Sequence, residues 1–120
     1  MDKGQALQAF WGGFGLSAYE NTTVPKDAEM PYITYEVVTD SDGNTVSMSG
    51  DLWYYGESWM PVDRMADIVS KFIGYGGIVL KMDDGYVWIK KGTPFAQHVA
   101  DPNDMVRRVR LGVEVDYLTE

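Results

Sequence analysis

Within the segment 105–118, residues 108–117 alternate strictly between polar or glycine positions and apolar positions. Its apolar positions are Val109, Leu111, Val113, Val115 and Tyr117, and the residues between them are Arg108, Arg110, Gly112, Glu114 and Asp116. Because successive side chains of a strand point to opposite faces, this period of two predicts a long strand with one buried face and one face open to water. The open face would carry mainly charges, which favours a chain that pairs and assembles over one that catalyses a reaction.

The composition indicates a globular protein of ordinary size. The chain has 120 residues, of which 45% are hydrophobic and 13% aromatic, enough to build a core and too apolar for a disordered class. We therefore expect residues 1–120 to form one α+β domain. The chain has no cysteine, which excludes disulfides and thiolate metal sites. Its first residues lack the pattern of a secretory signal, and no apolar run approaches the roughly 20 residues of a membrane span, so we expect cytoplasmic synthesis and no membrane partner.

The net charge of −8 is distributed unevenly. Residues 1–60 hold two of the ten Lys and Arg residues but nine of the 18 Asp and Glu residues. An acidic chain is a poor candidate for nucleic-acid binding, because such binding depends on neutralising phosphates. The charge favours either a solvated acidic surface or attraction between the acidic half of one copy and the mixed half of another.

Two segments have the spacing of amphipathic helices. Residues 3–11 place Ala6, Leu7, Phe10 and Trp11 on one stripe, and Gly12, Gly13 and Gly15 follow as a stop. The second segment begins at Ser58, which we expect to cap the helix, and ends at Gly74. Its stripe consists of Val62, Met65, Ala66, Val69, Phe72 and Ile73, and Pro61 is tolerated in the first turn. The polar segment 16–30 is predicted to be a loop.

The remaining segments predict two hairpins and a connection. Residues 32–39 and 45–55 are rich in strand-forming residues and flank the turn-forming segment 40–44. Residues 78–82 and 86–91 flank Asp84-Gly85, which predicts a type I′ turn. Segment 92–104, which contains Pro94 and Pro102, is predicted to be a long loop that acts as a contact arm. The expected fold is α+β: a mainly antiparallel sheet of about five strands with two helices packed on one face.

Residues capable of catalysis or metal binding are scarce and isolated. His98 is the only histidine, and it follows a proline in the predicted loop, so we expect an exposed polar residue. The acidic pairs Asp40/Asp42 and Asp83/Asp84 lie in predicted turns, where aspartate serves the backbone. The glycine-rich segments 12–15 and 74–77 lack the strand-before, helix-after context of a phosphate-binding loop. We expect no catalytic residue, no metal and no cofactor.

Aromatic and basic residues are the better candidates for function. The aromatics either fill the core or contact a partner, and they are Trp53, Tyr54, Tyr55, Trp59 and Trp88. A basic patch would form if the last strand lay near the second hairpin, from Lys90, Lys91, Arg107, Arg108 and Arg110. Such a patch would meet DNA or an acidic neighbour, and the acidic first half of the chain favours the neighbour. The expected oligomer-interface residues are Arg107, Arg108, Arg110, Trp59 and Phe95.

Several short segments resemble a known family. They are residues 31–36 (Pro-Tyr-Ile-Thr-Tyr-Glu), the strand around 52–54 (Leu-Trp-Tyr), the helix that ends at Gly74, and residues 106–111 (Val-Arg-Arg-Val-Arg-Leu). Together with the order of elements, they resemble the tail-completion proteins of long-tailed (siphovirus-type) bacteriophages and prophages, and the tail terminator family in particular. The resemblance implies a small α+β subunit without catalytic residues or cofactor. In that family, a hexameric ring on the tail tube stops tube polymerisation and presents a surface to the head connector.

The resemblance therefore implies a virion structural protein that is assembled in the host cytoplasm and located in the tail or neck. Its expected partners are further copies of itself, the tail tube protein, the head–tail connector or stopper protein, and genomic DNA that passes through the ring without sequence-specific binding. An acidic bore would repel the DNA and allow it to slide. A connector, a stopper or another minor tail protein is the alternative within this class. From another class, a small ligand-binding module or enzyme would depend on His98 or on Asp83 and Asp84.

Overall fold

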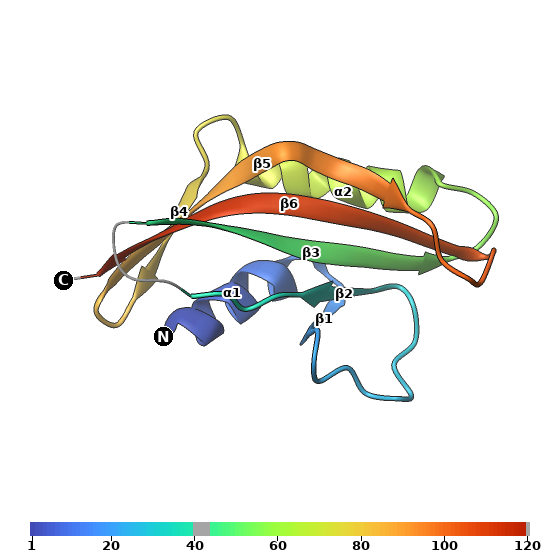
Figure 1. Cartoon of the computed structure of the whole chain (residues 1–120), viewed down its shortest axis with the longest axis horizontal. Helices are drawn as coiled ribbons and strands as arrows, with labels where there is room; N and C mark the ends of the chain where they lie inside the picture. Colours follow the sequence, from blue (N-terminus) through green and yellow to red (C-terminus); the bar gives the residue numbers. More distant parts are fainter. Residues whose placement is uncertain (40–43, 120) are drawn as a thin grey trace.

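The computed structural model describes residues 1–39 and 44–119 and confirms the α+β class (Figure 1). Its elements are helix α1 (Lys3–Trp11), the 3-10 turn η1 (Gly12–Phe14), strands β1 (Ser17–Glu20), β2 (Tyr32–Tyr35) and β3 (Thr45–Tyr55), helix α2 (Met60–Ile73), and strands β4 (Ile78–Met82), β5 (Gly85–Val99) and β6 (Val106–Thr119). The predicted helix 3–11 and the long closing strand are confirmed. The turn chemistry expected at 40–43 lies outside the described residues.

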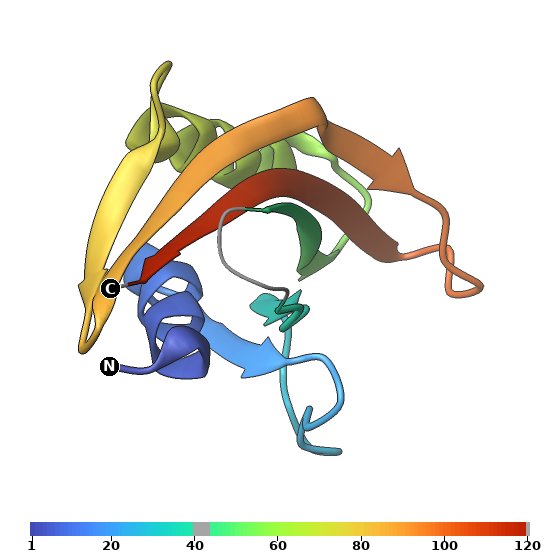
Figure 2. The ribbon, with the colours of Figure 1, turned by 60° about the vertical axis from the view of Figure 1, so that its left-hand side comes forward.

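One six-stranded sheet forms the body of the molecule, in the order β1-β2-β3-β6-β5-β4. Strand β6 lies at its centre and pairs antiparallel with β3 and with β5. The remaining pairs are antiparallel except β1 with β2, which is parallel. The sheet curls strongly across its width, as Figure 2 shows. The sheet is therefore mixed, and it has one strand more than the sequence predicts.

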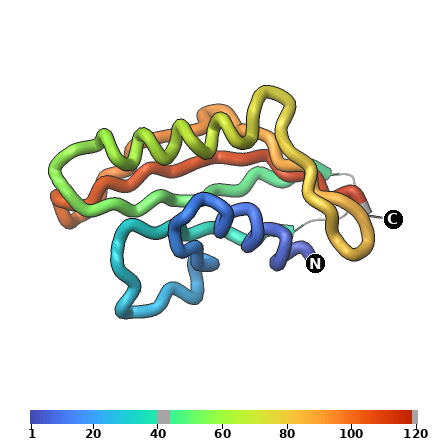
Figure 3. The backbone as a smooth tube through the Cα atoms, turned by 180° about the vertical axis from the view of Figure 1, so that it is seen from behind, coloured from blue at the N-terminus to red at the C-terminus, as the bar shows by residue number. Residues whose placement is uncertain are grey.

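Helices α1 and α2 both pack against the curled sheet (Figure 3). Helix α2 buries Val62, Ala66, Val69 and Ile73 against β3, β5 and β6. The two helices also meet each other, because the Phe72 ring lies 6.3 Å from the Phe10 ring and 5.4 Å from the Phe14 ring, between centroids. All the buried apolar side chains of these elements join one core. We call this side of the sheet the covered face.

Helix α1 connects the two outer strands of the curled sheet. It contacts both β1 and β4. At one end, the Gln8 side chain donates a hydrogen bond to the carbonyl of Ala18 in β1, 3.3 Å away. At the other end, the amide of Asp83 donates to the carbonyl of Met1, 2.9 Å away. The N-terminal segment thus fills the space between the ends of the sheet.

A close approach between α1 and β3 requires glycine at one position. A Cβ atom on Gly50 would lie 2.6 Å from Cη2 of Trp11, well inside van der Waals contact. The indole of Trp11 also stacks on Tyr35, with 6.4 Å between ring centroids. Gly50 therefore permits a tryptophan that is 1% exposed to lie directly on the strand.

Two segments that the sequence predicts as loops contain strands. The loop expected at 16–30 contains β1, which pairs with β2. The prediction of a loop at 92–104 is wrong for residues 92–99, because β5 continues to Val99. The pairing of β5 with β6 shifts between Lys91 and Ala96, and a Cβ on Gly112 would lie 2.9 Å from the carbonyl oxygen of Pro94. A bulge over a glycine therefore accommodates the proline that suggested a loop.

The hairpin and helix-start predictions need smaller corrections. Met82 pairs with Gly85, so the turn residues are Asp83 and Asp84, one position earlier than predicted. No non-glycine residue in the described part of the chain has a positive φ, so a type I′ turn is wrong there. Helix α2 starts with Trp59 as its N-cap residue, although the Ser58 hydroxyl accepts a hydrogen bond from the Met60 amide at 3.1 Å. Pro61 in the first turn and Gly74 at the exit are as predicted.

Candidate functional site on the open face of the sheet

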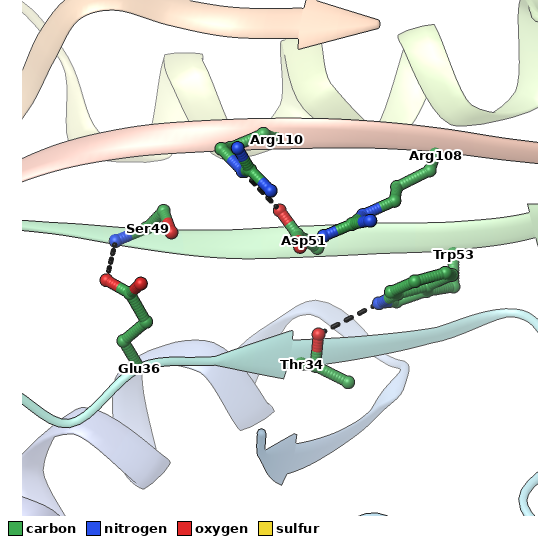
Figure 4. Close-up of polar contacts among 7 residues, drawn as sticks. All are labelled: Thr34, Glu36, Ser49, Asp51, Trp53, Arg108 and Arg110. Atoms are coloured by element: carbon green, nitrogen blue, oxygen red, sulfur yellow. Dashed lines mark hydrogen bonds and ion pairs between the residues drawn. The ribbon is translucent and has the colours of Figure 1, made fainter. Parts of the chain in front are cut away.

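The face of the sheet that points away from the core, which we call the open face, gathers charged and aromatic side chains from distant parts of the chain. Strand register places Tyr32 beside Trp53 and Trp53 beside Arg108. One step along the strands, Thr34 lies beside Asp51 and Asp51 beside Arg110. Figure 4 shows the polar contacts of this region. The period of two in β3 and β6 directs these residues away from the core.

Asp51 is the centre of the charged group. Only 8% of the residue is exposed, which is unusual for a carboxylate. Nε of Arg108 donates to its Oδ2 at 3.1 Å, and Nε of Arg110 donates to its Oδ1 at 3.3 Å. Burying a carboxylate costs free energy unless cations and hydrogen bonds compensate it, and here two arginines do so. The sequence reasoning missed Asp51, because its partners lie 57 and 59 positions away.

An aromatic row runs beside this group. The indole Nε1 of Trp53 donates a hydrogen bond to the Thr34 hydroxyl at 2.8 Å (Figure 4). The guanidinium of Arg108 lies 4.4 Å from the centroid of the Trp53 ring, in a cation–π contact. The Tyr32 ring lies 6.2 Å from that of Trp53 and 5.9 Å from that of Tyr19. Arg108 is thus held by both an anion and an aromatic ring.

A small polar pocket, which we call the arginine pocket, opens between β2, β3 and β6. Its lining consists of Asn21, Thr34, Tyr35, Glu36, Ser49, Asp51, Arg108 and Arg110. Glu36 is engaged by the backbone, because its Oε2 accepts from the Ser49 amide at 3.1 Å (Figure 4).

Burial, with a contribution from the charge of Glu20, raises the pKa of Tyr35 above its ordinary value. Tyr35 is therefore neutral at pH 7, and its hydroxyl donates to the Gln8 side chain. The half-exposed guanidinium of Arg110 is the donor in this pocket that suits a partner carboxylate.

The other end of the open face, toward the end of β6, also combines a cation, a carboxylate and an aromatic ring. Lys90 forms an ion pair with Asp116 at 3.1 Å and lies 4.3 Å from the Trp88 ring centroid. A hydrogen bond from the Thr45 hydroxyl, and to a smaller extent the contact with Lys90, lowers the pKa of the Asp116 carboxyl, while partial burial opposes this shift. Exposed apolar side chains accompany these charges, namely Val79, Tyr86 and Leu118.

The five basic residues of the expected patch are divided between the two faces. Arg108, Arg110 and Lys90 lie on the open face. Arg107 is in register with Tyr54, and Lys91 with Val113, which places both on the covered face. The Lys91 ammonium donates to the Ser70 hydroxyl of α2 at 3.1 Å. The structure therefore does not bring the five residues together.

Arg107 and Trp59 belong to a second cluster, at the far end of the covered face. Arg107 donates to the carbonyl of Glu57 at 3.1 Å and 3.0 Å and to that of Asp104 at 2.6 Å, and its guanidinium lies 5.4 Å from the Trp59 ring centroid. Trp59 stacks on His98 with 3.7 Å between centroids. We call Arg107, Trp59 and His98 the stacked cluster.

The positions of His98 and Phe95 follow from the extension of β5. His98 lies in a strand rather than in the predicted loop, and its Nε2 is 2.8 Å from Oδ1 of Asp63 on α2. Phe95 lies in the bulge and is half-buried against the core, with the Lys91 ammonium 6.0 Å from its ring centroid. The proposed interface residues therefore occupy three separate places: the arginine pocket, the stacked cluster and the bulge.

Residues 1–39 and 44–119 contain neither a group of metal-ligating side chains nor a long apolar helix. Within those ranges, no three or more His, Asp or Glu side chains gather closely enough to hold a metal ion. Within the same ranges, no helix has the length and apolar character needed to span a membrane. Comparison of the chain with protein-family models, with curated proteins and with solved structures finds no match.

Proposed function

We propose that the chain is a non-enzymatic structural subunit of a phage tail, a tail terminator that assembles into a homo-oligomeric, hexameric ring. The ring would lie at the head-proximal end of the tail tube, join the tube to the head connector, and let genomic DNA pass without sequence-specific contact. A mainly antiparallel sheet with helices on one face, in a terminator-like arrangement, is part of this proposal. The resemblance in residues 31–36, 52–54 and 106–111 supports the family, and the surface of the molecule supports assembly.

The observation that carries the assembly proposal is the exposure of large apolar side chains on both faces. On the covered face, Ile68 and Phe72 of α2 and the neighbouring Tyr75 are exposed. On the open face, Val79, Tyr86 and Leu118 are exposed and lie on three adjacent strands. Separate apolar surfaces of this kind mark sites that a partner covers. Two different surfaces on opposite faces suit a contact in which unlike patches meet, and such contacts generate rings.

The test is the solution mass, measured by light scattering over a range of protein concentration and salt and followed by particle imaging of any large species. A closed ring near six copies supports the terminator. Adding the ring to a polymerising tail tube protein, and separately to a portal complex, then distinguishes a terminator from a connector or stopper. A terminator caps the tube and limits its length. A ring that binds only the portal would contradict the terminator and favour the connector.

A further inference from the structure

Arg110 offers hydrogen-bond donors that the chain itself does not use. A guanidinium has five N–H donors arranged as a planar fork. Its Nε reaches Asp51 at 3.3 Å, and 44% of the Arg110 side chain is exposed. Within the part of the chain that the structure describes, the two terminal nitrogens of Arg110 have no hydrogen bond or ion pair. The fork is therefore open toward the arginine pocket.

The neighbouring charges make Arg110 the cation that this pocket presents. Arg108 is occupied, because its Nε and Nη2 both donate to Asp51 and its guanidinium lies on Trp53. The two acids of the pocket are also occupied, Asp51 by both arginines and Glu36 by the Ser49 amide. A carboxylate that enters the pocket would meet the fork of Arg110, which binds carboxylates in a bidentate manner.

The chain carries an exposed carboxylate far from Arg110 along the sheet. The β4–β5 turn lies near both termini in Figure 1. Gly85, next to this turn, pairs with Thr119 of β6, whereas Arg110 lies nine positions earlier on the same strand. The turn presents two acids, Asp83 and Asp84. Asp83 pairs with the N-terminal amine. Asp84 is exposed and has no ion pair or hydrogen bond among the described residues.

We infer that Asp84 in the β4–β5 turn of one copy docks on Arg110 in the arginine pocket of the next copy. The inference rests on the homo-oligomer of the proposed function and names the contact that joins its subunits. The two charges are separated by about nine residues of extended strand, roughly 30 Å, so one copy cannot join them itself, and each docked copy leaves its own pocket free for another. Such a contact is heterologous and closes into a ring when the rotation per subunit allows. Salt weakens it, because both groups are exposed before docking.

The test uses charge reversal, with solution mass as the readout. Arg110→Glu and Asp84→Arg each place like charges at the contact and are expected to weaken self-association about tenfold or more. The double variant R110E/D84R restores opposite charges and is expected to assemble again. An equimolar mixture of the two single variants is also expected to assemble, because every contact between alternating copies then joins opposite charges. Misfolding of either variant cannot produce such recovery.

Matched controls are Arg64→Glu and Asp27→Arg, which reverse exposed charges elsewhere and should leave the mass unchanged. Circular dichroism confirms that each variant is folded. If the native chain forms a ring and R110E forms the same ring at the same concentration, the inference is overturned and the proposed function survives. Folded single variants that dissociate but do not recover in the double variant or the mixture also overturn it. A native chain that stays monomeric at every concentration overturns both the inference and the autonomous ring.

Discussion

The two faces of strand β6 are built from alternate residues of the same segment but are held in different ways. On the covered face, Val109, Leu111 and Val113 are at most 2% exposed and pack under the helices. On the open face, Arg108 and Arg110 meet Asp51, and Asp116 meets Lys90. Apolar burial stabilises the first face in proportion to the area removed from water, whereas the second depends on a few directed contacts.

The difference between the two faces of β6 shows which of its side chains are available to bind a partner. The buried side chains of β6 cannot contact a partner, because each is already surrounded by its neighbours in the core. A face held by directed contacts keeps unused donors, such as the terminal nitrogens of Arg110. Variants that disturb one face and spare the other therefore test this division.

The largest effect is expected on the covered face. Leu111→Ala removes a side chain that is fully buried between β3, β5 and α2, and should lower the free energy of unfolding by about 3 kcal/mol. Ser47→Ala, on the open face, should cost about 0.5 kcal/mol, because its hydroxyl makes one hydrogen bond to Glu114 at 3.2 Å. Urea unfolding measures both. Equal losses would contradict the division between the faces.

Asp51→Ala should give the next largest effect, a loss of about 2 kcal/mol, because it leaves two arginines without their anion. The value lies below that of a fully buried pair, since Arg110 is half-exposed. Asp67→Ala is the control, because the Asp67–Lys71 pair is exposed on α2 and should affect stability much less. If the two substitutions were equally mild, Asp51 would not organise the open face.

Arg107→Lys should cost about 1 kcal/mol, because an ammonium cannot reproduce the hydrogen bonds of the guanidinium to the carbonyls of Glu57 and Asp104. The Trp59 fluorescence should change as well, since the guanidinium lies over its ring. Arg64→Lys, on the exposed side of α2, should change neither stability nor fluorescence. An unchanged spectrum in R107K would show that the stacked cluster does not depend on this contact.

The smallest effect concerns pH. The Thr45 hydroxyl and Lys90 hold the pKa of Asp116 below its ordinary value, so the folded state favours the ionised carboxylate. This contribution is fully present above about pH 4 and is lost as the pH falls through the lowered pKa. Unfolding measured from pH 6 to pH 2 should therefore show a steeper fall in stability for the native chain than for Asp116→Asn. If stability fell equally with pH in the native chain and in Asp116→Asn, the contacts of Asp116 with Thr45 and Lys90 would not stabilise the folded state.

The sequence predicts those elements whose pattern repeats over many residues. The alternation in β6 and the apolar stripes of α1 and α2 are local and strong, and all three elements appear where they are expected. Strand β1 was missed because it has only four residues. It also pairs in parallel with β2, so no tight hairpin turn between the two strands marks the pair in the sequence. The second half of β5 was missed because Pro94 usually ends a strand, and its bulge is tolerated only where Gly112 leaves room.

The candidate site was predictable only in part. The period of two separates Arg108 from Arg107 and could have assigned them to opposite faces. The partners of Arg108 and Arg110 were not accessible in this way, because Asp51 reaches them only through the register of β3 against β6. The burial of Asp51, which is only 8% exposed, also depends on how β3 pairs with β6. Sequence patterns thus locate the arginines, and long-range pairing determines which one remains free.

The order of strands in the sheet has a consequence for how the molecule reaches its structure. Strands β3 and β5 are synthesised before β6, yet β6 lies between them and pairs with both. Neither β3 nor β5 has its central neighbour until β6 is available, so their edges and apolar sides stay uncovered during that time. Folding that must wait for such distant pairings is slow compared with folding through local contacts. The emerging chain is therefore most prone to aggregate just before its central strand arrives.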